Sequence, residues 1–219
     1  MEIIKIIISE LPQFAKGTIV ALEVLAGLLI LGLVVGLAIA LAEIFGNSVV
    51  KFLATTIRKI LWAIPQLVLL FLVFYLPFDL NPVFAAIIAL GLCSSAFQSQ
   101  IFRGAILSVQ SGQTEAAKAM GLSTPRIIVY VILPQMVRFA IGPWTNEFAS
   151  ELKDTSLAYV VGVVEIMRHA KYIIAYTFGN AAAVYLFVGC LYFALTRIGT
   201  YFFYKLEEKL WVPGFEKRS

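Results

Sequence analysis

The chain has 219 residues, of which 61% are hydrophobic and 14% are charged, and its mean hydropathy is +0.92. A typical soluble domain is about 45–50% apolar and about 25% charged, so this composition excludes an ordinary soluble enzyme, a disordered chain and a disulfide-stapled scaffold. The formal net charge of +4 fits the Lys and Arg surplus of cytoplasmic loops rather than nucleic-acid binding. The composition therefore predicts an all-α membrane protein.

We expect five spans, because a membrane-crossing helix needs about 20 apolar residues and five stretches of the chain approach or exceed that length. These stretches are residues 18–42, 60–78, 83–107, 127–149 and 181–203. The mixed segment 147–171 is too charged for a plain span and too apolar for a plain loop, so we interpret it as a membrane-associated gate segment. Residues 1–219 then form a single transmembrane domain.

The first span carries small residues at a regular spacing. Gly32 and Gly36, followed by Ala40, lie four residues apart. In lipid, small residues at this spacing form a smooth groove that lets two helices approach closely. The pattern favours tight packing of this span against another helix, although chance spacing in a Gly-rich helix is the alternative.

The distribution of basic residues sets the expected orientation. With the N-terminus outside, twelve of the 17 Lys and Arg residues lie on the cytoplasmic side. Cytoplasmic loops carry the Lys and Arg excess, so the sequence predicts an N-out, C-in topology. The polar segment 108–126 then lies in the cytoplasm between spans three and four.

This cytoplasmic segment has the signals of two short helices. Thr114 is a candidate cap for a helix that begins at Glu115, an acid that suits the positive end of a helix dipole. Gly121 is placed to end that helix in a left-handed conformation. Thr124, followed by Pro125, starts the second helix. The Ala-rich surface between these signals suits docking of another protein, with a solvated connector as the alternative.

The same segment resembles the EAA loop of ABC-importer permeases. The resemblance rests on Glu115-Ala116-Ala117, then Gly121, then the run Val131-Ile132-Leu133-Pro134, at the family's spacing. It implies the fold of a type I importer permease, with a cytoplasmic coupling helix that sits in a groove of an ATP-binding subunit. The residues expected to couple this chain to the ATPase are Glu115, Ala116, Ala117 and Gly121.

The match extends to the polar amino-acid branch of these permeases. It includes Ile101-Phe102-Arg103-Gly104 ahead of the loop and Lys153-Asp154-Thr155-Ser156-Leu157 after it. The resemblance implies a dimer with a second copy or a related permease, two ATPase subunits, an extracytoplasmic substrate-binding protein and an amino-acid substrate, in the inner membrane of a prokaryote. Gln100 stands where the family often has an acid, which leaves the identity of the substrate open.

Three acids are expected to share one helix face. Glu147, Glu151 and Asp154 are spaced four and three residues apart, which places them on one side of an α-helix. An acidic face at membrane depth is costly unless it meets a cavity, a partner or a cation. We interpret it as part of a hydrated substrate path in which an acid pairs with the substrate ammonium. Local ion pairing, for example with Lys153, is the structural alternative.

Polar side chains on two other stretches complete the expected path. Near the acids these are Asn146, Thr155 and Ser156, and on the facing wall of span three they are Ser94, Ser95, Gln98 and Gln100. Hydroxyl and amide groups suit recognition of a zwitterion, but the same groups also form hydrogen bonds between helices in lipid. Both interpretations of the span-three wall stay open at this point.

The sequence contains no candidate catalytic machinery. It has no nucleophile–base pair, no cluster of metal ligands and no GxxxxGK[ST] phosphate loop. We therefore expect a transport subunit without its own enzyme activity, cofactor or metal, in a complex whose ATPase subunit binds ATP and Mg²⁺.

The expected function is the membrane-spanning subunit of an ATP-driven importer of polar amino acids, working by alternating access. An ion-coupled secondary transporter or channel that uses Glu147, Glu151 and Asp154 is the alternative, and an inverted repeat would support it.

The topology prediction is testable by cysteine labelling. In a Cys93→Ala, Cys190→Ala background, Lys118→Cys should react with a membrane-impermeant maleimide only after the cells are opened, because residue 118 is expected in the cytoplasm. Lys5→Cys, expected outside, is the control and should react in intact cells. Labelling of residue 118 in sealed cells would contradict the orientation.

Overall fold

The computed structural model describes residues 2–177 and 181–210, and these residues form helices and no strands. The all-α class is therefore confirmed. Four helices or continuous helical runs are long and apolar enough to cross a membrane, and one bent helix pair makes a fifth. The elements are α1 (Glu2–Ser9), α2 (Leu11–Phe45), α3 (Ser48–Ala63), α4 (Gln66–Phe74), α5 (Pro82–Leu107), α6 (Ser111–Ala119), α7 (Thr124–Ile127), the π-helix η1 (Ile128–Ile132), α8 (Leu133–Asp154), the 3₁₀ helix η2 (Thr155–Val161), α9 (Ile166–Thr177) and α10 (Ala181–Leu210).

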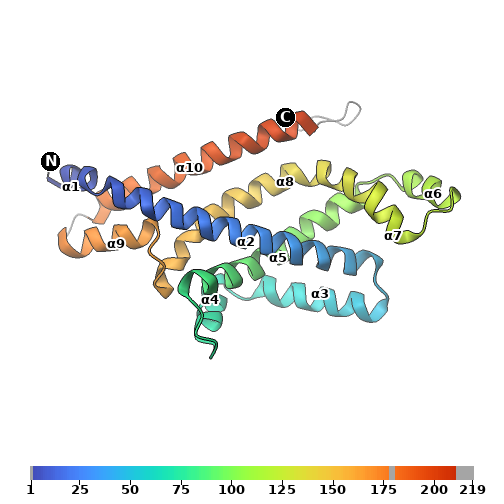
Figure 1. Cartoon of the computed structure of the whole chain (residues 1–219), viewed down its shortest axis with the longest axis horizontal. Coiled ribbons are helices and arrows are strands. Elements are labelled where there is room, and N and C mark those ends of the chain that lie inside the picture. The colour runs from blue at the N-terminus through green and yellow to red at the C-terminus, as the bar shows by residue number, and fades with distance from the viewer. Residues whose placement is uncertain (1, 178–180, 211–219) are drawn as a thin grey trace.

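The two ends of the molecule carry different elements (Figure 1). The short helices α6 and α7 lie at one end, and α1 and α9 lie at the other. An ion-pair cluster ties three helices together where α2 ends: the Glu43 carboxylate lies 2.7 Å from Arg58 on α3 and 3.6 Å from Arg103 on α5. The orientation predicted above places the α6 end in the cytoplasm and the α9 end outside.

The second span is bent rather than straight. α3 and α4 meet at an angle of 100°, at the dipeptide Ile64-Pro65. Proline has no backbone N–H to continue the helix, and it forces the preceding residue into an extended conformation. Ile64 is extended accordingly, with φ −76° and ψ 127°. The bend aims the first turn of α4, and with it Gln66, toward the end of α8.

The glycines of α2 make the close helix contact that their spacing predicts. A Cβ atom on Gly36 would lie 2.9 Å from the carbonyl oxygen of Ser95 on α5, and one on Gly32 would lie 2.4 Å from the Gln98 side-chain nitrogen. Ala40 is fully buried further along the same helix. α2 therefore packs backbone to backbone against α5, and this contact is the centre of the bundle.

Gly36→Ala should lower the stability of the chain, because the added methyl meets the rigid backbone of α5. Overpacking of this kind costs about 1–3 kcal/mol, measured as a lower thermal midpoint of the purified permease in detergent. Gly104→Ala is the matched control, since nothing lies within 4 Å of a Cβ at that helical position. Equal midpoints for the two variants would contradict the packing described here.

Candidate functional site

The expected coupling helix is present as α6, but it begins earlier than predicted. It starts at Ser111 with Gln110 as the residue before it, so the prediction that Thr114 caps a helix starting at Glu115 was wrong. The Thr114 hydroxyl lies inside the helix and donates back to the Ser111 carbonyl at 2.7 Å. A threonine can satisfy its hydroxyl on a preceding carbonyl just as well as on a free N–H, and residues 111–113 extend the helix toward its N-terminus.

The end of α6 is as predicted. Gly121 has φ +78°, and the helix closes with two bonds, from Gly121 N–H to the Lys118 carbonyl at 2.9 Å and from Leu122 N–H to the Ala117 carbonyl at 3.1 Å. This pattern is a Schellman motif. It reverses the chain, so that α7 begins at Thr124 with Pro125 in its first turn. From there the helical backbone continues through η1 and α8 into η2, a run of 38 residues from Thr124 to Val161.

The four expected coupling residues divide between two faces of the turn. Ala117 is buried with Phe102 and Ile127, and it anchors α6 to the bundle. Glu115, Ala116 and Gly121 are exposed, and Met120 next to them is 75% exposed. The structure thus presents an open, small-residue surface at the tip of the molecule that is held rigidly from beneath.

The three acids predicted to share a face do so at the far end of α8. Glu151 is only 2% exposed, and the Glu147 carboxyl one turn earlier and the Ser94 hydroxyl of α5 act on its carboxyl group electrostatically. Asp154, in the last turn, accepts a hydrogen bond from the Gln66 amide of α4 at 3.2 Å. Three helices therefore converge on these carboxyl groups.

These acids lack the partners that buried charge requires. One buried oxygen of each of two acids, Glu147 Oε1 and Glu151 Oε2, has no hydrogen-bond partner in the described part of the chain. Within residues 2–177 and 181–210, the ion pairs closer than 4.0 Å involve Glu43 and not these acids. The Lys153 side chain is exposed. Among the described residues no cation lies within 4.0 Å of these acids, although Lys153 is near enough to Asp154 to act on it electrostatically.

The polar groups of α5 are mostly engaged inside the bundle. Gln98 is fully buried, donates to the Ser94 hydroxyl at 3.0 Å and accepts from the Trp144 indole of α8 at 3.0 Å. The Ser95 hydroxyl donates to the Leu92 carbonyl at 2.6 Å. Gln100 is exposed. Of the four candidate residues on this wall, Ser94 is the one that reaches the acids.

The remaining candidates surround the end of α8. Asn146 is exposed and Ser156 is half-buried. Thr155 is fully buried and donates to the Leu152 carbonyl at 2.7 Å. These three side chains lie close to the acids along the chain, but their polar groups do not all turn toward one point.

Sequence reasoning missed three residues that organise this region. Trp144 closes the Gln98 network, Gln66 binds Asp154, and Glu165 lies fully buried between η2 and α9. Trp144 precedes Glu147 by three residues and so shares its face, which was an available signal. The position of Gln66 depends on the 100° bend, and that of Glu165 on a tertiary contact with Tyr192 at 2.9 Å, which no local pattern encodes.

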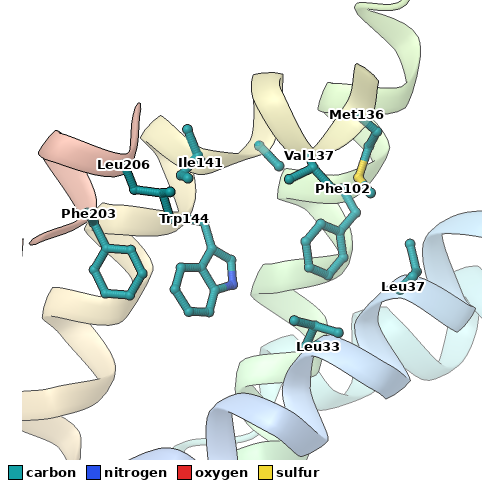
Figure 2. A pocket seen from close by; sticks show the side chains of 10 residues that line it. Leu33, Leu37, Phe102, Met136, Val137, Ile141, Trp144, Phe203 and Leu206 are labelled. Atoms are coloured by element: carbon teal, nitrogen blue, oxygen red, sulfur yellow. The ribbon is translucent and has the colours of Figure 1, made fainter. Parts of the chain in front are cut away.

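A separate cavity of about 260 Å³ lies between α2, α5, α8 and α10 and is wholly apolar. Figure 2 shows Phe102, Met136, Trp144 and Phe203 around it. The remaining lining residues are Leu33, Leu37, Val137, Ala140, Ile141 and Leu206. The indole N–H of Trp144 is already bound to Gln98, so this cavity offers no hydrogen bond to a zwitterion, and the acids of α8 are the better candidate site.

Comparison with known proteins identifies the family. Residues 29–212 match the model of the binding-protein-dependent transport system inner membrane component. The chain belongs to this family. Its permease relatives include the glutamine transport system permease protein GlnP of Escherichia coli K12, which is 34% identical over 185 residues, covering 82% of this chain and 84% of that protein. The probable amino-acid ABC transporter permease protein YckA of Bacillus subtilis is 32% identical over 209 residues, covering 94% of this chain and 92% of that protein.

Solved structures agree with this assignment. The permease resembles a chain in a crystal structure of an amino acid ABC transporter with histidines, with a TM-score of 0.83 and 26% identity over 93% of this chain and 96% of that chain. An inward-facing structure of the MetNI methionine ABC transporter shares the fold, with a TM-score of 0.76 at 20% identity over 93% of this chain and 99% of that chain. The chain is thus the permease subunit of an amino-acid ABC importer, as the EAA loop indicated, rather than an ion-coupled secondary transporter.

If the acids of α8 bind substrate at the expense of stability, replacing one of them should stabilise the permease and reduce its transport activity. Glu151→Gln replaces a buried acid that has no cationic partner in the described structure, while keeping the side-chain shape. Removing a buried acid that lacks a partner should raise the thermal midpoint of the isolated permease in detergent, while amino-acid uptake by the assembled transporter falls. Glu23→Gln, on an exposed position of α2, is the control and should change neither. A lower midpoint for Glu151→Gln would show that the carboxyl is structural.

Proposed function

We propose that this permease, paired with a second permease subunit and two ATPase subunits, carries amino acids across the inner membrane after their delivery by an extracytoplasmic binding protein. The family description names binding-protein-dependent transport. ATP and Mg²⁺ are then held by the ATPase subunits, and α6 is the surface on which they dock. The relatives are named for different substrates, such as glutamine and nopaline, so the proposal covers the amino-acid class and not one member.

The proposed substrate contact is the acidic group formed by Glu147, Glu151 and Asp154. The observation that carries it is the pair of buried carboxylate oxygens without a hydrogen-bond partner, on Glu147 and Glu151. Buried charge is stable only when paired, and every amino acid brings an ammonium group. A charge-assisted hydrogen bond from that ammonium contributes about 1.5–3 kcal/mol, which offsets part of the cost of burying the acids.

The other predicted path residues take lesser parts in this proposal. Ser94 lies beside the acids and suits a contact with the substrate carboxylate. Asn146, exposed on α8, and Ser156, half-buried in η2, lie along the approach to the acids, whereas the buried Thr155 hydroxyl is occupied by the Leu152 carbonyl. Ser95, Gln98 and Gln100 act at most indirectly, since the first two are occupied inside the bundle and the third is exposed elsewhere.

The proposed coupling route is the helical run from α7 to η2. The ATPase would bind the exposed side of α6, and the Schellman turn at Gly121 connects α6 to the start of this run. Because α7, η1 and α8 are continuous, a displacement of α6 moves the same rigid element that carries Glu147 and Glu151. The π-helical turn η1 lies between the docking surface and the acids, and such turns are frequent at functional sites.

Gly121→Val tests the coupling role. A β-branched residue strains the left-handed conformation at φ +78°, so the turn between α6 and α7 should distort while the spans still fold. In proteoliposomes with the ATPase and loaded binding protein, we expect stimulated ATP hydrolysis and uptake to fall by about tenfold, as for a loss near 1.4 kcal/mol.

Gly121→Asn is the matched variant, because asparagine tolerates the left-handed region. It should retain most of the stimulated activity. Full stimulation and uptake in Gly121→Val would overturn the proposed role of this turn in coupling.

A further inference from the structure

The outer face of α9 is built differently from its inner face. Ile166, Ala170 and Ile173 are buried, at spacings of four and three residues. Among the other positions, Lys171, Tyr172 and Tyr176 are exposed and Arg168 is partly exposed. We call the group Arg168, Lys171, Tyr172, Tyr176 and Tyr185 the α9 surface. It lies at the end of the molecule opposite α6 (Figure 1), where the predicted topology places the extracytoplasmic side.

The cations of the α9 surface are held in place by aromatic rings. The Lys171 ammonium lies 5.6 Å from the ring centre of Tyr185 and 5.8 Å from that of Tyr159. The Arg168 guanidinium lies 5.3 Å from the ring centre of Tyr172 and donates to its hydroxyl at 3.1 Å. Side chains ordered in advance lose little freedom when a partner binds, so this geometry favours recognition.

Within the part of the chain that the structure describes, the same cations form no ion pair. Among the described residues, neither Arg168 nor Lys171 lies within 4.0 Å of a carboxylate oxygen. The nearest acid in sequence, Glu165, is fully buried, and its oxygens accept from the N–H groups of Met167 and Arg168 and from the Tyr192 hydroxyl. Hydrogen bonding to Tyr185 raises the pKa of the Lys171 ammonium, so it stays charged at physiological pH.

We propose that the α9 surface is the docking site for an acidic patch on the extracytoplasmic binding protein. The inference rests on the proposed function, in which a binding protein delivers the substrate. Arginine and tyrosine are enriched at the energetic centres of protein interfaces, and two unpaired cations select an acidic partner. Tyr172 is 45% exposed and Tyr176 is 50% exposed, which leaves aromatic area for such a partner to cover.

The α9 surface is also connected to the proposed substrate acids by packed side chains. Glu165 caps α9 and binds Tyr192 of α10, while its neighbours Val161 and Val163 pack in the same core cluster as Leu152 of α8. A force on α9 therefore reaches the end of α8, one turn from Glu151. Binding of the binding protein to the α9 surface would therefore act on α8, the same helix that α6 moves from the cytoplasmic side.

The test measures ATP hydrolysis by the assembled transporter in phosphatidylcholine nanodiscs as a function of binding-protein concentration. The Arg168→Glu, Lys171→Glu variant should need about tenfold more binding protein for half-maximal stimulation, with the basal rate unchanged. Raising the salt concentration should weaken docking to the wild type more than to the variant. Lys5→Glu, a charge reversal at an exposed lysine at the same end of the molecule, is the control and should leave the curve unchanged.

A zero-length amine–carboxyl cross-linker provides a second measurement that does not depend on activity. The binding protein should cross-link to Lys171 in the wild type. Lys171→Arg should lose that cross-link while keeping the wild-type stimulation curve, because arginine keeps the charge but forms no amide with the reagent.

The outcomes separate the two claims. An unchanged half-maximal concentration in the double variant, or the absence of a Lys171 cross-link in a wild type that the binding protein stimulates, would overturn the docking site and leave the proposed function intact. A wild-type complex that no binding protein stimulates would overturn the proposed function itself. A concentration shift that appears only in nanodiscs with anionic lipid, without a cross-link between Lys171 and the binding protein, would assign the α9 surface to lipid headgroups and overturn the inference.

Discussion

Every polar group at membrane depth needs a partner within the protein, because lipid supplies none. In this permease that requirement divides the polar residues into two sets. The glycines of α2 let α5 approach so closely that Gln98 and Ser95 find their partners inside the bundle. The acids of α8 lie beside this satisfied network, yet Glu147 and Glu151 each keep a buried oxygen without a partner. The packing of α2 against α5 therefore leaves these acids among the buried groups without a partner in the described chain, which is the basis of the proposed substrate contact.

The geometry also explains how one subunit connects two distant events. The helical run from Thr124 to Val161 has 38 residues, and at 1.5 Å per residue it is about 57 Å long. Its first turn follows the Schellman motif behind the exposed side of α6, and the acids lie near its other end. In the proposed mechanism, a movement of α6 displaces this helical run and with it the carboxyl groups of Glu147 and Glu151. Alternating access then needs no chemistry in this subunit.

Local signals in the sequence predicted those parts of the fold that local physics decides. The left-handed Gly121, the start of α7 at Thr124 and the close approach at Gly36 follow from backbone sterics and side-chain size. The start of α6 was not predicted correctly. The Thr114 hydroxyl can either accept from a free N–H or donate to a preceding carbonyl, and residues 111–113 extend the helix so that it donates to Ser111. The partners of Gln98, Gln66 and Glu165 depend on contacts between helices far apart in the chain. A single sequence showed that the α5 wall was polar but not that its groups are engaged internally.

The central claim is that Glu147 and Glu151 hold the cationic group of the substrate. Equilibrium binding of tritiated L-amino acids to the ATP-free transporter, first for the wild type and then for the Glu147→Gln, Glu151→Gln variant, tests it most directly. Loss of a charge-assisted contact worth about 1.5–3 kcal/mol predicts an affinity about 10- to 100-fold weaker in the variant, with Glu23→Gln unchanged. Equal affinity in the wild type and the double variant would contradict the claim and remove the acids from the substrate path.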